Sequence, residues 1–384
     1  MTKKNDQAPL TAFGARVRKS PYFAATRRYG YKAYTIYNHM YLPVYHEDPV
    51  EDYWRLINDV TFWDVACERQ VEITGRDAAR FVQFLTPRNL STCAIGQCKY
   101  VFMTNEDGGI INDPILLRLA ENHFWLSLAD SDAMLWAQGV AINSGMQVRI
   151  TEPDVSPLQV QGPKSPQVIQ TLFGDWVAKL RYYWCKETQL DDIPVVVSRT
   201  GWSGERGYEI FLRDNRYGDA LWEAVMEAGK PYNIGLGAPS QIRRIEAGIL
   251  SYGADMTINE NPFELGFERL VDLEQDAEFI GKTALKRIKT EGIKRRLVGV
   301  EIHGASLDST NEHPWPVISD GSQPGKLTSC VYSPRLGKNI GLALVPLAHS
   351  QAGSMLTIDT PYGKRQATVV PLPFYDPKKT IPTS

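Results

Sequence analysis

The pattern of hydrophobic and polar positions in the first half of the chain predicts short strands mixed with helices. Residues 71–75 alternate as a strand does, and the apolar positions of 76–85 recur at helical spacing. Two apolar runs, 100–104 and 110–119, flank a DGG sequence at 107–109 that is typical of a hairpin turn. Because a hairpin pairs its strands antiparallel, this pattern favours an α+β fold over a doubly wound parallel sheet.

The same mixture continues to about residue 290 and then changes. Beyond that point, short apolar runs are broken by Gly, Pro and Ser, which is typical of a β-barrel or sandwich. A basic run at 286–296 separates the two regions, and residues 1–20 are polar and basic, as expected of a flexible N-terminal arm. The domains we expect are therefore 1–20, 21–290 and 291–384. Further strands are expected at 33–43, 61–65, 125–128, 195–198 and 209–212, and further helices at 132–142, 214–229 and 240–250.

Composition narrows the class of protein. The chain has 384 residues, with 42 basic and 44 acidic side chains, so it lacks the excess of Lys and Arg expected of a nucleic-acid-binding protein. No apolar stretch approaches the ~18 residues of a membrane span, and the five scattered cysteines form no CxxC pair. We therefore expect a cytoplasmic protein with reduced thiols, no bound metal, no nucleic-acid partner and no membrane partner.

Three segments could carry chemistry, and each also has an ordinary structural explanation. Asp113 follows the predicted hairpin, where it could serve only as a turn-capping residue. The loop 198–209 gathers carboxylates, aromatic side chains and glycines, and such glycines allow a backbone to approach a flat ligand closely, although an ordinary loop would look the same. Charged residues at 243–246 interrupt an apolar helix, which a structural ion pair would explain equally well.

Six spaced motifs in this order resemble the glycine cleavage T-protein superfamily of folate-dependent one-carbon enzymes. They are Gln161-Gly162-Pro163, RTGWSGERGYEI at 199–210, RIEAGILSYG at 244–253, 261–266, FIGK at 279–282 and a C-terminal set at 328–340 with Pro373-Phe374. The resemblance covers about residues 30–376. It implies a multi-domain cloverleaf with mixed and antiparallel sheets, two intertwined folate-binding subdomains and a C-terminal β-barrel.

Within the superfamily, the N-terminal third resembles the dimethylsulfoniopropionate demethylases. The matching segments are AYTIYNHM at 33–40, WDVACERQVEI at 63–73, Asn112-Asp113-Pro114 and LSLADSD at 126–132. This branch transfers a methyl group from the sulfonium donor to N5 of tetrahydrofolate. The resemblance therefore implies an enzyme with tetrahydrofolate as methyl acceptor and a small-molecule donor, and it leaves a homodimer open.

The resemblance also assigns roles to individual residues. Asp113 matches an aspartate beside the reacting folate nitrogens and is the expected catalytic residue. The other expected folate-binding residues are Tyr100, Glu209, Arg244 and Glu246, and those expected near the sulfonium donor are Ser127, Trp202 and Phe211. Phe211 departs from the tyrosine of the demethylases, which leaves the identity of the donor open.

Other readings remain at this point. The donor could be a betaine or an O-methyl compound, for which His39 could act as a proton donor to a phenolate, although a hydrogen-bonded histidine is the simpler explanation. Aminomethyl transfer would require a lipoylated carrier protein. A folate-binding role in iron–sulfur assembly would require a cysteine motif, and none occurs in the loop at 201–209. Aromatic faces at Tyr37 or Trp184 could stabilise a cationic donor, and the basic run 286–296 could attract a polyglutamate tail or could be a solvated linker.

Overall fold

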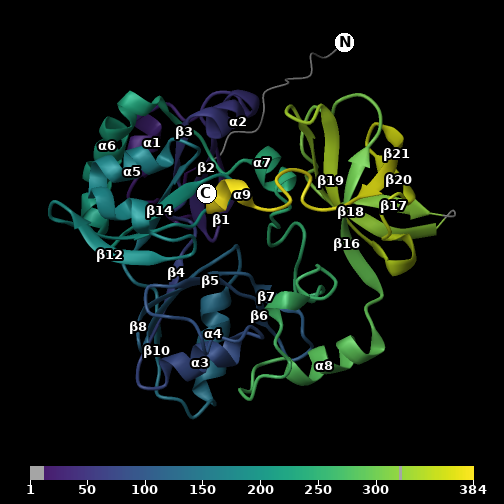
Figure 1. Ribbon diagram of the computed structural model, residues 1–384, viewed down its shortest axis with the longest axis horizontal. Helices are drawn as coiled ribbons and strands as arrows, with labels where there is room; N and C mark the ends of the chain where they lie inside the picture. The colour runs from purple at the N-terminus through teal and green to yellow at the C-terminus, as the bar shows by residue number, and fades with distance from the viewer. Residues whose placement is uncertain (1–12, 320–321) are drawn as a thin grey trace.

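The computed structural model describes residues 13–319 and 322–384, which form three lobes around a common centre (Figure 1). Residues 1–12, the greater part of the expected arm, lie outside the described residues. The last residues of the expected arm, 18–20, are attached to the first lobe. The Ser20 hydroxyl donates to buried Asp64 at 2.6 Å, and the Arg18 amide donates to the His39 carbonyl at 2.8 Å.

The first lobe is built on a six-stranded sheet in the order β12-β13-β14-β11-β3-β15. All neighbours are antiparallel except β15 and β3. Apolar residues of helices α5 and α6 pack on one face of this sheet. The strands are β3 (Val60–Asp64), β11 (Ser156–Gln161), β12 (Cys185–Leu190), β13 (Ile193–Ser198), β14 (Gly207–Leu212) and β15 (Ile234–Leu236), and the helices are α1 (Phe23–Arg28), α2 (Pro49–Asn58), α5 (Ser165–Phe173) and α6 (Gly218–Gly229).

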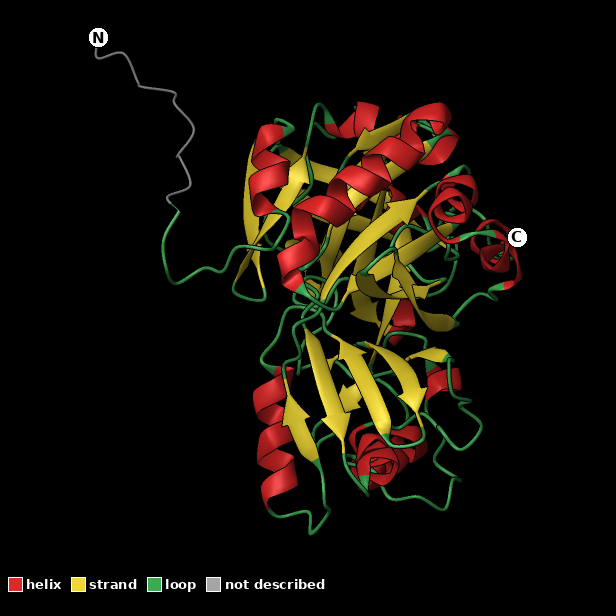
Figure 2. Cartoon of the chain, turned by 90° about the vertical axis from the view of Figure 1, so that its left-hand side faces the viewer, coloured by secondary structure: helices red, strands yellow, loops and turns green. Residues whose placement is uncertain are grey.

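The second lobe has a five-stranded antiparallel sheet in the order β10-β4-β9-β8-β5, with α3 and α4 packed on one face (Figure 2). Its other face packs against the first lobe, where Trp125 and Leu117 contact Phe211 and Val196. Its elements are β4 (Gln70–Thr74), α3 (Ala78–Leu85), β5 (Cys98–Tyr100), β8 (Ile115–Ala120), β9 (His123–Ser127), α4 (Ala133–Ile142) and β10 (Arg149–Thr151), with the small sheet β6 (Met103–Thr104) and β7 (Ile110–Asn112) and helix α8 (Lys282–Glu291) beside it.

The third lobe is a closed barrel in the order β16-β19-β18-β17-β20-β21. Its strands are β16 (Arg295–Ile302), β17 (Trp315–Ser319), β18 (Ser322–Ser333), β19 (Lys338–Pro346), β20 (Met355–Thr360) and β21 (Gly363–Val370). The remaining elements are the hairpin β1 (Ala33–Tyr37) and β2 (Met40–Tyr45), the helices α7 (Gln241–Glu246) and α9 (Thr380–Thr383), and short 3-10 turns at Asp175–Lys179, Asn215–Tyr217, Lys230–Tyr232, Glu268–Leu270 and Leu347–His349. The barrel and mixed sheets confirm the expected α+β cloverleaf. Among the described residues, no helix has both the length and the apolar character needed to cross a bilayer.

The expected hairpin 100–119 is confirmed, because β5 pairs with β8 and β6 pairs with β7 in the same antiparallel register, and the Val101 amide donates to the Pro114 carbonyl at 3.0 Å between the two pairings. Two local predictions need correction. The extended segment 33–43 is itself a hairpin, whose turn residues Asn38 and His39 have positive φ. The helix expected at 240–250 ends at Glu246, and the chain then turns at Gly248, where φ is +64°.

The glycine-rich loop after β13 closes around a protein side chain. A Cβ at Gly201 or Gly207 would lie 2.3 or 2.1 Å from the side-chain oxygen of Gln161. The buried Gln161 side chain therefore occupies the space that these glycines leave, and it accepts a hydrogen bond from the Ser203 hydroxyl at 2.7 Å. The glycines allow the loop to close around a protein side chain, and this fixes the position of Trp202 between them.

Candidate functional site

A large cavity lies where the three lobes meet. Its volume is about 1280 Å³, larger than the roughly 300–1,000 Å³ of a typical small-molecule site. Its lining comes from the first two lobes, from barrel strand β18 and from the C-terminal segment around Tyr375 to Pro382. The cavity is therefore large enough for two small molecules side by side.

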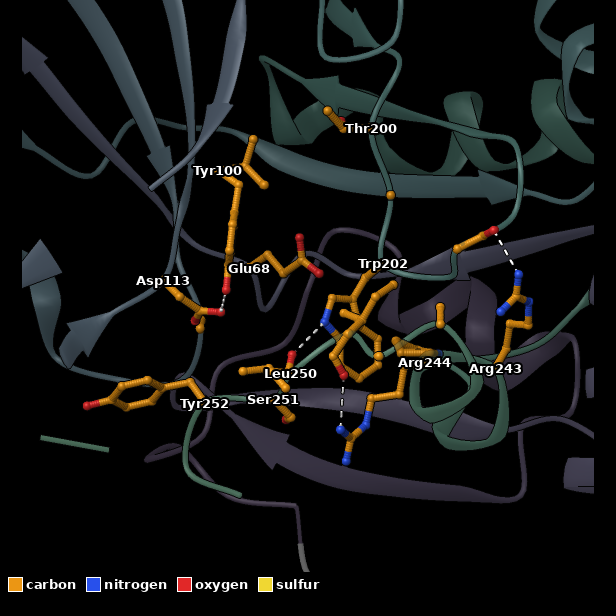
Figure 3. A pocket seen from close by; sticks show the side chains of 18 of the residues that line it. Glu68, Tyr100, Asp113, Thr200, Trp202, Arg243, Arg244, Leu250, Ser251 and Tyr252 are labelled. Atoms are coloured by element: carbon orange, nitrogen blue, oxygen red, sulfur yellow. Dashed lines mark hydrogen bonds between the residues drawn. The ribbon is translucent and has the colours of Figure 1, made fainter. Parts of the chain in front are cut away.

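Asp113 and Tyr100 meet on the wall formed by the second lobe. The pairing of β5 with β8 places Tyr100 opposite Ile115, two residues beyond Asp113, and the tyrosine hydroxyl donates to Asp113 Oδ2 at 2.9 Å (Figure 3). The other carboxyl oxygen, Oδ1, has no hydrogen-bond partner among the described residues. Burial raises the pKa of Asp113 to about 7, although the Tyr100 hydrogen bond opposes this shift. Asp113 can therefore exchange a proton near neutral pH.

Glu209 lies on the opposite wall, in the middle of β14. Alternate residues of this strand, Tyr208 and Ile210, face the helices of the first lobe, which leaves Glu209 facing the cavity. Strand register places Gln159 beside it, and the Gln159 amide donates to its carboxylate at 2.8 Å. The Thr200 hydroxyl also donates to Glu209. Burial raises the pKa of Glu209 despite these hydrogen bonds.

Glu68 is a third carboxyl group in the cavity wall, and no prediction from the sequence singled it out. It follows β3, and Figure 3 shows it between the Tyr100–Asp113 pair and Trp202. Burial, then the charges of Glu209 and Asp113, raise its pKa well above the usual value. Within the described part of the chain, no Lys, Arg or His lies within ion-pair distance of these three carboxyl groups, and they do not form a cluster that could hold a metal ion.

The predicted donor-site residues are only partly brought together. Trp202 lines the cavity, where its indole N–H donates to the Leu250 carbonyl at 3.2 Å and its ring lies 5.6 Å from the Arg244 guanidinium. Ser127, at the end of β9, also lines the cavity and accepts a hydrogen bond from Gln70 at 2.8 Å. Phe211 is fully buried against Trp125 and is not a lining residue.

The two predicted residues of helix α7 connect the site to the barrel. Arg244 lines the cavity, but its guanidinium donates to Asp255 at 2.7 Å and to the Ser329 hydroxyl of β18 at 2.7 Å. Glu246 is fully buried outside the cavity and accepts hydrogen bonds from Tyr53 at 2.7 Å and Ser333 at 2.6 Å. Both therefore hold α7 in place, Arg244 also contacts the Trp202 ring, and Glu246 is not a lining residue of the cavity.

Of the other residues singled out from the sequence, one lines the cavity and the rest lie outside it. Tyr37 lines the cavity. Trp184 lies outside it, with the Arg181 guanidinium 3.9 Å above its ring. His39 is an exposed residue of the β1–β2 turn, 3.2 Å from Asp132. No residue of the basic run 286–296 lines the cavity, and Arg295 and Arg296 pair instead with glutamates of the neighbouring segment, Glu264 and Glu268.

The three-lobed fold also occurs in a solved structure. A solved structure described as the glycine cleavage system aminomethyltransferase T from Bartonella henselae superposes with a TM-score of 0.84, covering 94% of this chain and 98% of that one at 22% identity, which shows the shared fold. The GCVT N-terminal domain model matches residues 13–275, and the glycine cleavage T-protein C-terminal barrel domain model matches 295–376.

Two relatives cover nearly the whole chain. The dimethylsulfoniopropionate demethylase DmdA of Ruegeria pomeroyi is 39% identical over 354 residues, covering 92% of this chain and 96% of the relative. An aminomethyltransferase of Thermoanaerobacter pseudethanolicus is 31% identical over 366 residues, covering 94% and 98%. The chain belongs to the glycine cleavage T-protein family. This confirms the expected class, an enzyme of one-carbon transfer that uses tetrahydrofolate.

The cavity has groups that suit a folate. Asp113 Oδ1 and Gln159 Oε1 are buried oxygen atoms without a partner among the described residues, and with Glu209 they could accept hydrogen bonds from the N–H groups of a pterin. Basic side chains also line the cavity and match the anionic glutamyl end of a folate; they are Arg88, Lys99, Arg269, Lys378 and Lys379.

Proposed function

We propose that this chain transfers a methyl group from dimethylsulfoniopropionate to N5 of tetrahydrofolate, giving 3-methylthiopropionate and 5-methyltetrahydrofolate. The observation that carries the proposal is the set of three carboxyl groups, Glu68, Asp113 and Glu209, around one cavity without a cationic side chain paired to them. Such a site favours a positively charged ligand. The 39% identity to the demethylase supports a sulfonium as that ligand.

The residues of the site suit this reaction. When bound, tetrahydrofolate supplies the N5 lone pair that receives the methyl group. The carbon–sulfur bond of the donor breaks, and its electron pair returns to sulfur, which leaves as a neutral thioether that needs no proton. We propose that Asp113 accepts the proton released from N5, since its free Oδ1 and its pKa of about 7 suit a base at neutral pH. Trp202 and Tyr37 offer aromatic faces to the sulfonium, which stabilise a desolvated cation by about 0.5–2 kcal/mol each.

We further propose that Tyr100 fixes the Asp113 carboxyl, that Glu209 and Gln159 bind the pterin, and that Ser127 contacts the donor. The Gln70 side-chain amide donates to the Ser127 hydroxyl at 2.8 Å, so the protein orients this hydroxyl before the methyl donor binds. Holding donor, methyl group and nitrogen in line within a closed cavity is the main contribution that a protein can make to such a transfer.

A direct assay tests the proposal. Purified protein would be incubated anaerobically with tetrahydrofolate and dimethylsulfoniopropionate, and 5-methyltetrahydrofolate and 3-methylthiopropionate would be followed by mass spectrometry. Equal appearance of both products supports the proposal. If neither product forms while tetrahydrofolate still binds, the donor is wrong, and glycine betaine and methyl ethers become the donors to try.

Aminomethyl transfer is the second candidate, because the aminomethyltransferase of Thermoanaerobacter pseudethanolicus is 31% identical over most of the chain. It requires an aminomethyl group carried on a lipoylated protein. The same preparation would be given such a carrier and tetrahydrofolate. Formation of methylenetetrahydrofolate and ammonia, without activity toward the sulfonium, would replace the first proposal by this one.

A further inference from the structure

Glu68 differs from the other two cavity carboxyl groups in how little the protein satisfies it. Glu209 accepts hydrogen bonds from Thr200 and from Gln159, and Asp113 accepts one from Tyr100. The only side-chain donor near the Glu68 carboxylate among the described residues is the Gln159 amide, at 3.5 Å, the outer limit of a hydrogen bond. A carboxylate with so few partners in a cavity wall is stabilised by a ligand cation or by a proton.

The backbone around Glu68 holds the side chain in a defined place. Its amide donates to the Val65 carbonyl at 2.8 Å, and its carbonyl accepts from the Gln70 side chain at 2.6 Å. The preceding carbonyl, that of Cys67, accepts from the Asn38 amide at 3.0 Å. Gln70 also contacts Ser127, so Glu68 and the expected donor-site serine are positioned by the same side chain.

The surroundings of Glu68 suit a small cation. Burial, and then the negative charge of Glu68, raise the pKa of the neighbouring Tyr37 phenol. Trp202 lies on another side of Glu68 in the same cavity (Figure 3). The amide of Gln159, which is 1% exposed, lies 3.5 Å from Glu68 and 2.8 Å from Glu209, so Glu68 lies beside the wall proposed to bind the pterin. A carboxylate with aromatic neighbours is the arrangement that binds sulfonium and quaternary ammonium groups.

We propose that Glu68 is the counter-ion for the positive charge of the methyl donor, and so selects cationic over neutral donors. This inference rests on the proposed function and adds the residue that sets its donor class. In this assignment Glu209 binds the folate and Asp113 accepts the N5 proton, so neither is needed to balance the charge of the donor.

Steady-state kinetics of Glu68→Gln tests this assignment, with Glu68→Asp as the conservative variant and Glu121→Gln as the matched control. Glu121 is exposed and outside the cavity, so the control makes the same chemical change away from the site. We expect Glu68→Gln to raise KM for dimethylsulfoniopropionate by at least about 30-fold, the usual effect of removing one partner of a buried charge pair, while Glu68→Asp retains part of the affinity. The Kd of tetrahydrofolate should stay within about twofold of wild type in all three variants.

4-Methylpentanoate separates charge from shape, because it keeps the carboxylate of dimethylsulfoniopropionate and replaces the sulfonium by an uncharged carbon. As a competitive inhibitor it should lose no affinity in Glu68→Gln, because its uncharged end makes no charge pair with Glu68. Equal KM values for dimethylsulfoniopropionate in wild type and Glu68→Gln would overturn the assignment. A selective loss of tetrahydrofolate affinity in Glu68→Gln would also overturn it, by placing Glu68 at the pterin.

Failure of the proposed function is distinguishable from failure of this inference. If wild type binds dimethylsulfoniopropionate in equilibrium dialysis without demethylating it, the proposed reaction is wrong, and a loss of that binding in Glu68→Gln still supports the counter-ion. If wild type binds neither dimethylsulfoniopropionate nor glycine betaine, Glu68 does not serve a cationic donor.

Discussion

The raised pKa of Asp113 predicts that removing its charge stabilises the protein at alkaline pH. The pKa is about 7 in the folded state against 3.8 for the free side chain. The unfolded chain therefore releases this proton at lower pH than the folded one, so the folded state loses stability as pH rises from about 4 to about 7. Three pKa units correspond to about 4 kcal/mol, an upper value since water in the cavity reduces it.

Asp113→Asn tests this linkage. Between pH 5 and pH 8, we expect the stability of the variant relative to wild type to increase by up to about 2–3 kcal/mol. Urea unfolding followed by tryptophan fluorescence at pH 5, 6, 7 and 8 would measure it, with Asp107→Asn in the exposed DGG turn as the control. Parallel pH dependences for wild type and Asp113→Asn would refute the reasoning. The same variant should lose most methyl transfer, because an amide cannot accept the proton.

Three further substitutions have defined outcomes. Tyr100→Phe removes the hydrogen bond that lowers the Asp113 pKa, so the acidic limb of the pH profile of kcat/KM should move to higher pH. An unchanged limb would show that a group other than Asp113 produces it. Trp202→Ala should lower kcat/KM for a cationic donor by about 10-fold or more, and retention of full activity would exclude an aromatic contact with the donor. Phe211→Tyr should leave donor preference unchanged and reduce stability by about 1–3 kcal/mol in thermal unfolding, because the added hydroxyl enters a buried apolar cluster; a changed preference would place residue 211 at the donor.

The sequence predicted the elements of the fold better than their pairing. Apolar periodicity located α3 and α6, because each buries one face in a core. The strands around residues 195–212 were located as apolar runs, because both of their faces are buried. The hairpin at 100–119 could be predicted because its strands are neighbours in the chain. The pairing of β11 with β3 and β14 could not, since these strands are distant in sequence and tertiary packing decides their neighbours.

The residues of the candidate site could be predicted only in part from the sequence. Asp113, Glu209 and Trp202 came from motif resemblance, and the structure brings all three to one cavity. Glu68 and Gln159 escaped notice because their role depends on contacts across the chain: Gln159 reaches Glu209 only through the register of β11 with β14. The glycines of the loop 201–207 line the cavity, and only the structure reveals that Gly201 and Gly207 also make room for the Gln161 side chain.

The most direct test of the central claim is the transfer of an intact methyl group. Dimethylsulfoniopropionate labelled with trideuteromethyl groups would be mixed with enzyme and tetrahydrofolate, and the folate product would be analysed by mass spectrometry after a single turnover. The account predicts 5-methyltetrahydrofolate that carries the whole trideuteromethyl group, in equal amount to the thioether formed. Unlabelled folate together with unconsumed donor would contradict it.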